Sequence, residues 1–424
     1  MINTDIIFQY NYWEIFLFNC LLINFNIVKY ILYIKISTRG EIMIRYGIDD
    51  IERAKDIWRE NFTDSEEEID FYFKTIYRDK NFLMLEENGE IKASLHENPY
   101  NISFNGNILP SFYIVAVAVS PEYRGKGYMK KLLNHSLKNA LSNNRDIVFL
   151  SPINTEIYSN FGFGYISGLE HYELKLEDIP FNSINREIEI KKANENDFSN
   201  MINLYNKKME NNNIYLKRDH SYLTRIKGEI ENENGKIYVF YREKRITGYL
   251  ICYFREEEIF VREFFYSDIE SAKTMLVFIK TFKEYYPNLK VATPQGSNFN
   301  FLFPNQLKVE KKENPFILAR ILNVKNILSY LNIKRTAFNI KVKDNIIDEN
   351  NGVFSIEEDG NVGKIDNIDG WNIDIDIRDL ATLVSGYMSI DELLELEKVR
   401  INNVDLKTLN NIFKKQKNYI QEFQ

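Results

Sequence analysis

The most constraining stretch of this chain is residues 117–129, which read VAVSPEYRGKGYM. A near-continuous apolar run ends at a proline, two glycines flank a lysine, and a helical pattern begins immediately afterwards. Glycine accepts a left-handed backbone and lets the main chain approach a ligand closely. The first N–H groups of a helix are unpaired and carry the positive end of its dipole, so they attract anions. The order of residues therefore predicts an anion site between a buried strand and a helix.

Two cationic residues, Arg124 and Lys126, add positive charge to this turn. The apolar strand before it provides an extended edge beside the anion site. A diphosphate attached to an extended, amide-containing arm fits both features, and coenzyme A has that chemistry. Glycines beside a lysine also occur in ordinary surface turns. The specific signal is therefore the whole order of strand, proline, glycine turn, amphipathic helix and strand.

The composition is that of a folded protein with more than one domain. A chain of 424 residues is long enough for about two to four domains. With 44% hydrophobic and 27% charged residues, disorder does not describe the whole chain. A net charge of -7 argues against general nucleic-acid binding and favours neutral or cationic partners. The only cysteines, Cys20 and Cys252, can form at most one bridge, so we expect neither a disulfide framework nor a metal site.

Residues 1–42 differ in composition from the rest of the chain. The stretch 16–34 is long enough to span a bilayer, but three asparagines and Lys29 interrupt its apolar run, and no small-residue cleavage site follows. Two interpretations of this segment are open: it is a membrane anchor, or translation starts at Met43 and residues 1–42 are a mis-annotated upstream extension. The extension is favoured, because the sequence from Met43 opens with a short strand and an amphipathic helix, as a domain start does.

After this segment the sequence predicts three consecutive units, at residues 43–185, 186–317 and 318–424. Hydrophobic spacing in the first unit predicts a mixed α/β fold. Two Asn-Gly pairs, at 88–89 and 105–106, predict tight hairpin turns. The predicted helices of this unit cover 51–62, 66–77 and 129–141, and its predicted strands cover 82–85, 91–97, 111–119 and 146–150.

The second unit repeats this order more faintly, with a strand and a helix over 187–209 and a further strand at 289–294. Its counterpart of the glycine turn reads SDIESAK at 267–273 and contains no glycine. If the fold is duplicated, the second copy has lost its anion cradle. No proline- or glycine-rich linker separates the units, so we expect packed domains. The third unit is predicted as α+β, with strands at 338–344 and 352–360 and helices at 377–387 and 389–397.

Around the glycine turn the sequence resembles the GNAT acetyltransferase superfamily, whose motif is Arg or Gln, two residues, Gly, one residue, then Gly or Ala. Arg124 and Gly127 match this motif, whereas Met129 stands where the small residue is expected. One branch, the enhanced intracellular survival (Eis) acetyltransferases, carries a bulky residue there and a later I-Y-x-x-F-G-F/Y-G signature. This chain reads IYSNFGFG at 157–164, and its similarity to that branch covers residues 43–424.

The resemblance implies a fold that is α/β and α+β: tandem GNAT folds, each a mixed twisted sheet with flanking helices, followed by a sterol-carrier-like α+β domain. It implies an active first GNAT domain and a degenerate second one. Residues 371–394 look like part of the sterol-carrier-like domain. It also implies a bacterial, cytoplasmic homo-oligomer.

The resemblance further implies acetyl-CoA as the acetyl donor and no metal. In such families the main chain of the strand before the turn pairs with the pantetheine arm, the turn and first helical residues hold the pyrophosphate, and an asparagine after the next strand lies close to the cofactor. The cofactor residues implied here are Val117, Ala118, Val119, Arg124, Gly125, Lys126, Gly127, Tyr128, Met129, Lys130 and Asn154.

For the chemistry, the resemblance assigns Tyr158 as the acid that protonates the departing thiolate. Read without it, Tyr158 is a packed aromatic beside Phe161 and Phe163. The resemblance assigns the base to the C-terminal carboxylate, here that of Gln424, with Glu422 as the alternative because family members tend to end on an aromatic residue. A lone histidine such as His96 is more often structural than catalytic.

The substrate pocket implied by the resemblance is lined by Trp58, Phe62 and Asp64. Aromatic walls with carboxylates suit an aminoglycoside, a polyamine or a peptide lysine. The alternative is that Trp58 and Phe62 are simply the core face of a helix.

The sequence thus favours an acetyl-CoA-dependent N-acetyltransferase, in which a primary amine of a cationic substrate attacks the thioester directly. A carrier of lipid or apolar ligands and a CoA-binding regulator without turnover are the alternatives. We expect no nucleic-acid partner and no membrane partner.

Overall fold

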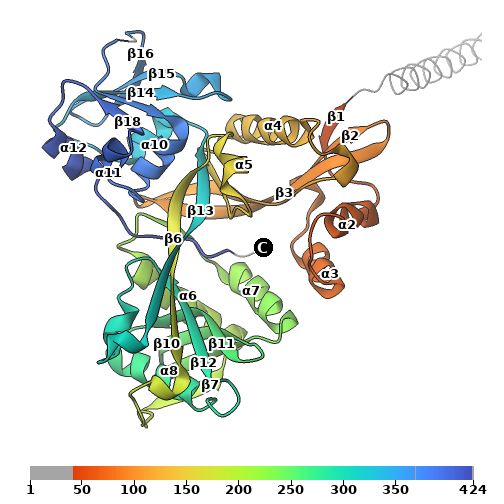
Figure 1. The fold of residues 1–424 in the computed structure, drawn as a ribbon, viewed down its shortest axis with the longest axis vertical. Helices are drawn as coiled ribbons and strands as arrows, with labels where there is room; N and C mark the ends of the chain where they lie inside the picture. Colours follow the sequence, from red (N-terminus) through yellow and green to blue (C-terminus); the bar gives the residue numbers. More distant parts are fainter. Residues whose placement is uncertain (1–41, 368, 423–424) are drawn as a thin grey trace, which may run out of the picture.

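The structure, a computed structural model, describes residues 42–367 and 369–422. The expectations for residues 1–41 and for Gln424 lie outside the described residues. Figure 1 shows three bodies arranged around the centre of the molecule: the first unit in red to yellow, the second in green to teal, and the third in blue. In the described part of the chain, no helix is both long and apolar enough to cross a membrane.

The first unit follows the order predicted from its hydrophobic spacing. Its elements are β1 (Met43–Tyr46), α2 (Ile51–Arg59), α3 (Glu66–Thr75), β2 (Phe82–Glu87), β3 (Glu90–Phe104), β4 (Asn107–Val119), α4 (Tyr128–Ser142), β5 (Ile147–Leu150), α5 (Thr155–Ser159) and β6 (Gly164–Lys175). Both Asn-Gly pairs form hairpin turns with positive φ, at 57° and 78° for Asn88 and Gly89 and at 46° and 80° for Asn105 and Gly106. The hairpin predictions are therefore confirmed.

Capping side chains set where the first two helices begin. Asp50 accepts a hydrogen bond from the Glu52 N–H at the start of α2. Ser65 and Glu68 form a reciprocal capping box at the start of α3. Both helices end two or three residues earlier than predicted.

The second unit has the same alternation of strands and helices. Its elements are β7 (Ile188–Lys192), α6 (Phe198–Met209), β8 (Ile214–Leu216), α7 (His220–Asn232), β9 (Lys236–Arg242), β10 (Arg245–Phe254), β11 (Glu258–Tyr266), α8 (Ile269–Lys280), β12 (Asn288–Pro294) and β13 (Glu310–Ile321). The third unit contains α9 (Val324–Tyr330), β14 (Phe338–Lys343), β15 (Gly352–Ile356), β16 (Val362–Ile365), β17 (Ile373–Asp376), α10 (Ile377–Val384), α11 (Ile390–Glu395), β18 (Val399–Ile401), α12 (Leu406–Ile412) and β19 (Asn418–Tyr419).

The thirteen described strands of the first two units and β19 of the third unit form one continuous 14-stranded sheet, whose main path is β1-β2-β3-β4-β5-β13-β6-β12-β11-β10-β9-β7. Strand β13 inserts between β5 and β6, and residues 318–321 pair with β5. The boundary expected near Leu318 therefore falls inside a strand of this sheet. The third unit has its own 5-stranded sheet. Long strands β6 and β13 connect the first two bodies in Figure 1.

Candidate active site

Strand β4 carries a bulge at the position where it parts from β5. Ser94 of β3 pairs with Ala118, but His96 pairs with Val115, so β4 has one extra residue there. Ala116 has a φ of 50°, which is uncommon for a residue other than glycine. The parallel pairing of β4 with β5 consists of Tyr113 opposite Phe149 alone. In the part of the chain that the structure describes, residues 114–119 thus leave their main-chain groups on the β5 side without a strand partner.

The glycine turn forms an open cradle at the end of this strand. Gly125 and Gly127 have φ values of 77° and 80°, a conformation that favours glycine. A Cβ added at either glycine would meet no atom within 4 Å. Helix α4 begins directly after Gly127, and no side chain caps its first N–H groups. This open helix start fits the diphosphate of coenzyme A.

The residues around the cradle differ in what they contact. Arg124 donates from Nη2 to the side chain of Asn61 at 2.9 Å, so its guanidinium bridges the turn to the end of α2. Lys126 lies over the ring of Tyr123, 4.7 Å from its centroid, and Lys130 is exposed. Tyr128 is buried and donates its hydroxyl to Glu87 at 2.6 Å. Of the remaining predicted cofactor residues, Met129 is half-buried in the first turn of α4, and Val117, Ala118 and Val119 lie on the unpaired edge of β4.

The second unit has closed the corresponding position. Its bulged strand β11 is also followed by a helix, α8, and by a parallel strand, β12. Asp268 caps the start of α8, because its carboxylate accepts a hydrogen bond from the Ser271 N–H at 2.9 Å. The chain thus places its own anion where an external anion would bind. This observation explains physically why the second copy lacks a cradle.

Tyr158 lies on α5, next to the splayed strands. Its side chain is 9% exposed, and burial raises the pKa of its phenol to about 12. Its ring makes an edge contact with Phe163 at 6.0 Å, so it is also the packed aromatic considered from the sequence. Asn154 begins the same helix, where its side chain accepts a hydrogen bond from the Glu156 N–H at 2.9 Å. Whether Asn154 also contacts a cofactor stays a prediction.

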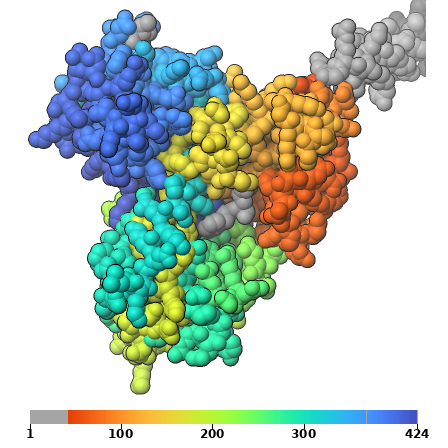
Figure 2. All heavy atoms as spheres, in the orientation of Figure 1, coloured from red at the N-terminus to blue at the C-terminus, as the bar shows by residue number. Residues whose placement is uncertain are grey.

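A pocket of about 440 Å³ opens between the first two units. Figure 2 shows the molecule hollowed between the red to orange residues of α2 and α3 and the green residues of α7. Tyr113 and Val115, which belong to the splayed strand β4, line this pocket together with residues of the second unit and Glu422. Its lining residues are Trp58, Asp64, Glu68, Phe71, Tyr72, Ile76, Asn98, Tyr100, Tyr113, Val115, His171, Arg225, Glu229, Asn232, Glu233, Tyr253, Arg255, Phe260, Arg262, Lys290 and Glu422.

Two of the three predicted substrate residues line the pocket. The indole N–H of Trp58 donates to the carboxylate of Asp64 at 2.7 Å. The Trp58 ring also packs against Tyr72 and Phe73, so it is both a core residue and a pocket residue. Phe62 contacts the Trp58 ring, with centroids 5.6 Å apart, but is not among the lining residues.

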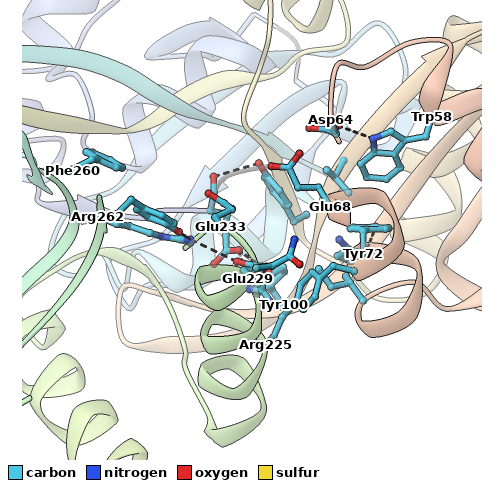
Figure 3. Close-up of a pocket in the computed structure, with 18 of the residues that line it drawn as sticks. Trp58, Asp64, Glu68, Tyr72, Tyr100, Arg225, Glu229, Glu233, Phe260 and Arg262 are labelled. Atoms are coloured by element: carbon cyan, nitrogen blue, oxygen red, sulfur yellow. Dashed lines mark hydrogen bonds and ion pairs between the residues drawn. The ribbon is translucent and has the colours of Figure 1, made fainter. Parts of the chain in front are cut away.

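Carboxylates from both units face the pocket. Figure 3 shows Trp58, Asp64 and Glu68 on one side and Glu233 and Arg262 on the other. Burial, with repulsion from the carboxylates of Glu68 and Glu229, raises the pKa of Glu233, although Arg262 opposes the shift. Among the described residues, neither Glu68 nor Glu233 has an ion-pair partner. The lining carboxylates are those of Asp64, Glu68, Glu229, Glu233 and Glu422, and the lining cations are Arg225, Arg255, Arg262 and Lys290, so the pocket has a small excess of negative charge.

The floor of the pocket is a buried network that includes the C-terminal segment. The carboxylate of Glu422 accepts hydrogen bonds from the hydroxyls of Tyr100 at 2.8 Å and Tyr222 at 2.7 Å, and from Arg225 at 3.0 Å. Burial acts to raise the pKa of Glu422, but the charges of Arg225 and Arg262 and these hydrogen bonds hold it below its usual value. The sequence reasoning missed the three bonding partners and Arg262, because no local pattern distinguishes these tyrosines and arginines.

His96 is a structural residue. It is 2% exposed, and the aromatic rings of Trp58, Tyr72, Phe73, Tyr77 and Phe82 surround it. Burial lowers its pKa to about 3, so the imidazole is neutral at ordinary pH. In the described residues, no group of three or more His, Cys, Asp or Glu side chains is arranged to hold a metal ion.

Comparison with family models identifies all three units. Residues 43–166 match one model of the acetyltransferase (GNAT) domain, and residues 215–321 match a second. Residues 324–421 match the sterol carrier protein domain. The chain thus contains two GNAT domains followed by a sterol carrier protein domain, as the sequence resemblance implied. No curated protein sequence matched the chain significantly.

Solved structures with the same arrangement share little sequence with this chain. A probable N-acyltransferase from Enterococcus faecalis V583 has 17% identity and a TM-score of 0.76, with 89% of this chain and 99% of that chain covered. A GCN5-related N-acetyltransferase from Anabaena variabilis has 18% identity and a TM-score of 0.78, with 89% and 97% covered. Eis1 from Mycobacterium abscessus has 14% identity and a TM-score of 0.72, with 89% and 98% covered. At these identities the likeness establishes the fold.

Proposed function

Because this chain is a GNAT-type N-acetyltransferase with a C-terminal sterol carrier protein domain, we propose that its first unit transfers the acetyl group of acetyl-CoA to a primary amine of a cationic substrate. Aminoglycosides, polyamines and peptide lysines are the candidate acceptors. One observation carries the proposal: β4 is shared by two sites. Tyr113 and Val115 line the acidic pocket, and the same strand continues through its unpaired edge to the uncapped start of α4.

The cofactor site in this proposal has two parts. The main chain of Val117, Ala118 and Val119 pairs with the pantetheine arm, and the N–H groups at the start of α4 bind the pyrophosphate. Arg124, Lys126 and Lys130 add positive charge, Gly125 and Gly127 leave space, and Asn154 borders the arm. The bound cofactor supplies an activated acetyl group as a thioester. Because Met129 is half-buried, it shapes the first turn of α4 from its packed side.

The pocket residues bind and orient the amine. Asp64, Glu68 and Glu233 attract the cationic substrate, while the Trp58 ring, with Phe62 packed against it, forms an aromatic wall. Holding the amine against the thioester carbonyl, which it attacks directly, lowers the entropic part of the barrier by several kcal/mol. The N–H groups at the β4 bulge polarise that carbonyl.

Tyr158 is the proposed acid. A tyrosine has a reference pKa of about 10, against about 8.5 for a cysteine-type thiol. Burial raises the pKa of Tyr158 to about 12, so the phenol is fully protonated at ordinary pH and has a proton to give. Its role is to give that proton to the departing thiolate.

The C-terminal carboxylate, that of Gln424, is the proposed base. Both carboxylate oxygens of the alternative, Glu422, already accept hydrogen bonds, and its pKa is lowered. Glu422 is therefore a poor proton acceptor. Gln424 follows it by two residues, which span at most about 7 Å of extended chain.

A thiol-release assay with acetyl-CoA tests the proposal across a panel of aminoglycosides, polyamines and lysine peptides. We expect turnover with at least one cationic amine and none with a neutral analogue of the same size. If acetyl-CoA binds but no amine is acetylated, the regulator alternative replaces the enzyme. If acetyl-CoA does not bind, a ligand-carrying role for the third unit becomes the better explanation.

A further inference from the structure

The C-terminal segment 418–422 is integrated into the sheet that forms the site. Strand β19 pairs in parallel with β8, and β8 pairs antiparallel with β3. Each of the three units therefore contributes one strand to this junction. The side chain of Asn418 secures it, because it accepts a hydrogen bond from the Ile214 N–H at 3.0 Å and donates to the carbonyls of Ile166 at 2.8 Å and Ser385 at 2.9 Å.

Beyond β19, the second unit binds the segment through two arginines. Arg225 of α7 donates to the Glu422 carboxylate at 3.0 Å. Arg262 of β11 donates from Nη2 to the main-chain carbonyl of Gln421 at 3.4 Å and forms an ion pair with Glu229 at 3.6 Å. Gln421, Glu422 and Arg262 are all at most 3% exposed. A buried carboxylate with this many donors is strongly fixed in place.

Arg262 occupies a particular position in the second unit. Ile251 of β10 pairs with Glu263, and the next residue, Cys252, pairs with Val261, so Arg262 is the extra residue of a bulge. The pairing of β11 with β12 covers only Glu258–Val261 of β11. The first unit has the same combination of a bulge and a splayed parallel pair at β4. Arg262 thus lies at the bulge of β11 that corresponds to the β4 bulge. In the proposed function, the β4 bulge faces the thioester.

We propose that the second GNAT unit has converted its acyl-transfer bulge into a clasp for the C-terminal segment. In this arrangement Arg262 and Arg225 are positioning residues that hold segment 418–422 against the reaction centre of the first unit. The catalytic purpose of the clasp rests on the proposed function. The contact that links the clasp to the centre is the Tyr113 hydroxyl, which donates to the Glu422 main-chain carbonyl at 3.5 Å. Tyr113 is also the residue at which β4 and β5 begin to part.

The test uses the full-length protein with Arg262→Met and Arg225→Met, and Lys227→Met as the matched control. Lys227 lies on the same helix as Arg225 but forms an exposed ion pair with Glu231. Hydrogen exchange of a peptide covering 418–422 should become faster in both arginine variants and remain unchanged in the control. We expect kcat to fall by about 10- to 100-fold, as when a reacting group is displaced by about 1 Å, while KM for acetyl-CoA stays within about twofold.

Conservative replacement separates positioning from simple stability. Arg262→Lys and Arg225→Lys keep the charge but lose the planar fork, so they should recover part of kcat and part of the exchange protection. If the methionine variants do not fold, the double variant Tyr100→Phe/Tyr222→Phe removes two hydrogen bonds to Glu422 without leaving a charge unpaired, and it should show the same pattern.

Unchanged exchange of 418–422 in an active arginine variant would overturn the clasp. Faster exchange with unchanged kcat would overturn its positioning role. If the parent protein acetylates no amine, the proposed function fails together with the catalytic purpose of the clasp, and the exchange measurement still decides whether these arginines hold the segment.

Discussion

Gly127 and Asp268 begin corresponding helices of the tandem units in opposite ways. Gly127 leaves the first N–H groups of α4 uncapped, whereas Asp268 fills the same position of α8 with its carboxylate, which Ser267, Ser271 and Arg242 also contact. The pKa of Asp268 is lowered: burial acts to raise it, but these hydrogen bonds and the Arg242 charge outweigh burial. The tandem units thus contain one open helix start and one that the chain itself caps.

Transferring this cap to the first unit should abolish cofactor binding. In Gly127→Asp, the new carboxylate would cap α4 and repel the diphosphate, and the φ of 80° would add backbone strain. We expect calorimetry to show at least about 100-fold weaker binding of acetyl-CoA, or about 2.7 kcal/mol. Asp268→Asn serves as the control and should bind normally. Binding within tenfold of the parent by a folded Gly127→Asp protein would contradict the anion site.

Tyr158→Phe should separate chemistry from binding. The phenylalanine keeps the edge contact with Phe163 but removes the proton of the proposed acid. Since a general acid contributes about 10²- to 10⁴-fold, we expect kcat to fall by at least about 100-fold while the Kd for acetyl-CoA is unchanged. Tyr165→Phe is a suitable control, because it removes a nearby phenol whose hydroxyl contacts Thr155 at the start of α5. Equal kcat for the parent and Tyr158→Phe would exclude the phenol as the acid.

The pH profile provides an independent check on Tyr158. A phenol is an acid only while protonated, so raising its pKa to about 12 extends its working range upward. We expect kcat of the parent protein to show no decline between about pH 8 and 10 attributable to this group. Steady-state rates at saturating amine and acetyl-CoA measure this. A descending limb in that range, absent in Tyr158→Phe, would show that the phenol ionises in it.

The parts of the site formed by neighbouring residues could be predicted from the sequence. The parts formed by residues far apart in the chain could not. The glycine turn depends on backbone freedom at two positions and on the helix that follows, both of which are local properties. Strand β3 was predicted only to residue 97, because Pro99 and the polar residues around it break the apolar pattern; its outer half is stabilised by pairing with β8 from the second unit.

The pocket floor shows the same limit at longer range. Tyr100 and Glu422 are 322 residues apart in sequence and form a hydrogen bond in the structure. Neither periodicity nor capping rules encode such a pair, since it depends on β13 inserting between β5 and β6 and on β19 docking on β8. Trp58 and Asp64 were predicted to line the pocket through the family resemblance, which assigns this helix–loop segment to the amine site.

The hydrogen bond between Trp58 and Asp64 should contribute to binding of the amine and not to binding of acetyl-CoA. Trp58→Phe removes the 2.7 Å hydrogen bond while keeping an aromatic ring against Tyr72. The freed Asp64 carboxylate can then leave the pocket wall. We expect KM for the amine to rise about 3- to 10-fold, corresponding to a net hydrogen-bond contribution of about 1 kcal/mol, with KM for acetyl-CoA unchanged. Asp64→Asn, which keeps an acceptor but removes the charge, should raise KM further if charge dominates recognition.

Glu97 should make the stability of the first unit depend on pH. Glu97 is a residue of β3, and its buried carboxylate accepts hydrogen bonds from Ser136 of α4 at 2.6 Å and from the Tyr46 hydroxyl of β1 at 3.0 Å. Burial raises its pKa to about 6, despite these hydrogen bonds and the nearby Arg145 charge. The folded protein thus binds this proton more tightly than the unfolded chain, whose glutamate has its ordinary pKa near 4.5. The contribution of Glu97 to stability therefore falls as pH rises from about 4.5 to 6 and stays low above that range.

Glu97→Gln preserves the size of the side chain and an acceptor oxygen but removes the buried charge. We expect the free energy of unfolding at about pH 7.5 to increase by up to about 2 kcal/mol, and the gain to vanish near pH 4.5, where the parent carboxyl is itself neutral. Urea unfolding of parent and variant at both pH values measures this difference, and effects common to both proteins, such as the titration of His96, cancel. Glu67→Gln, at an exposed position on α3, should show no such pattern. An equal difference at the two pH values would mean that the carboxyl of Glu97 does not titrate in this window, and its burial would then have another compensating partner.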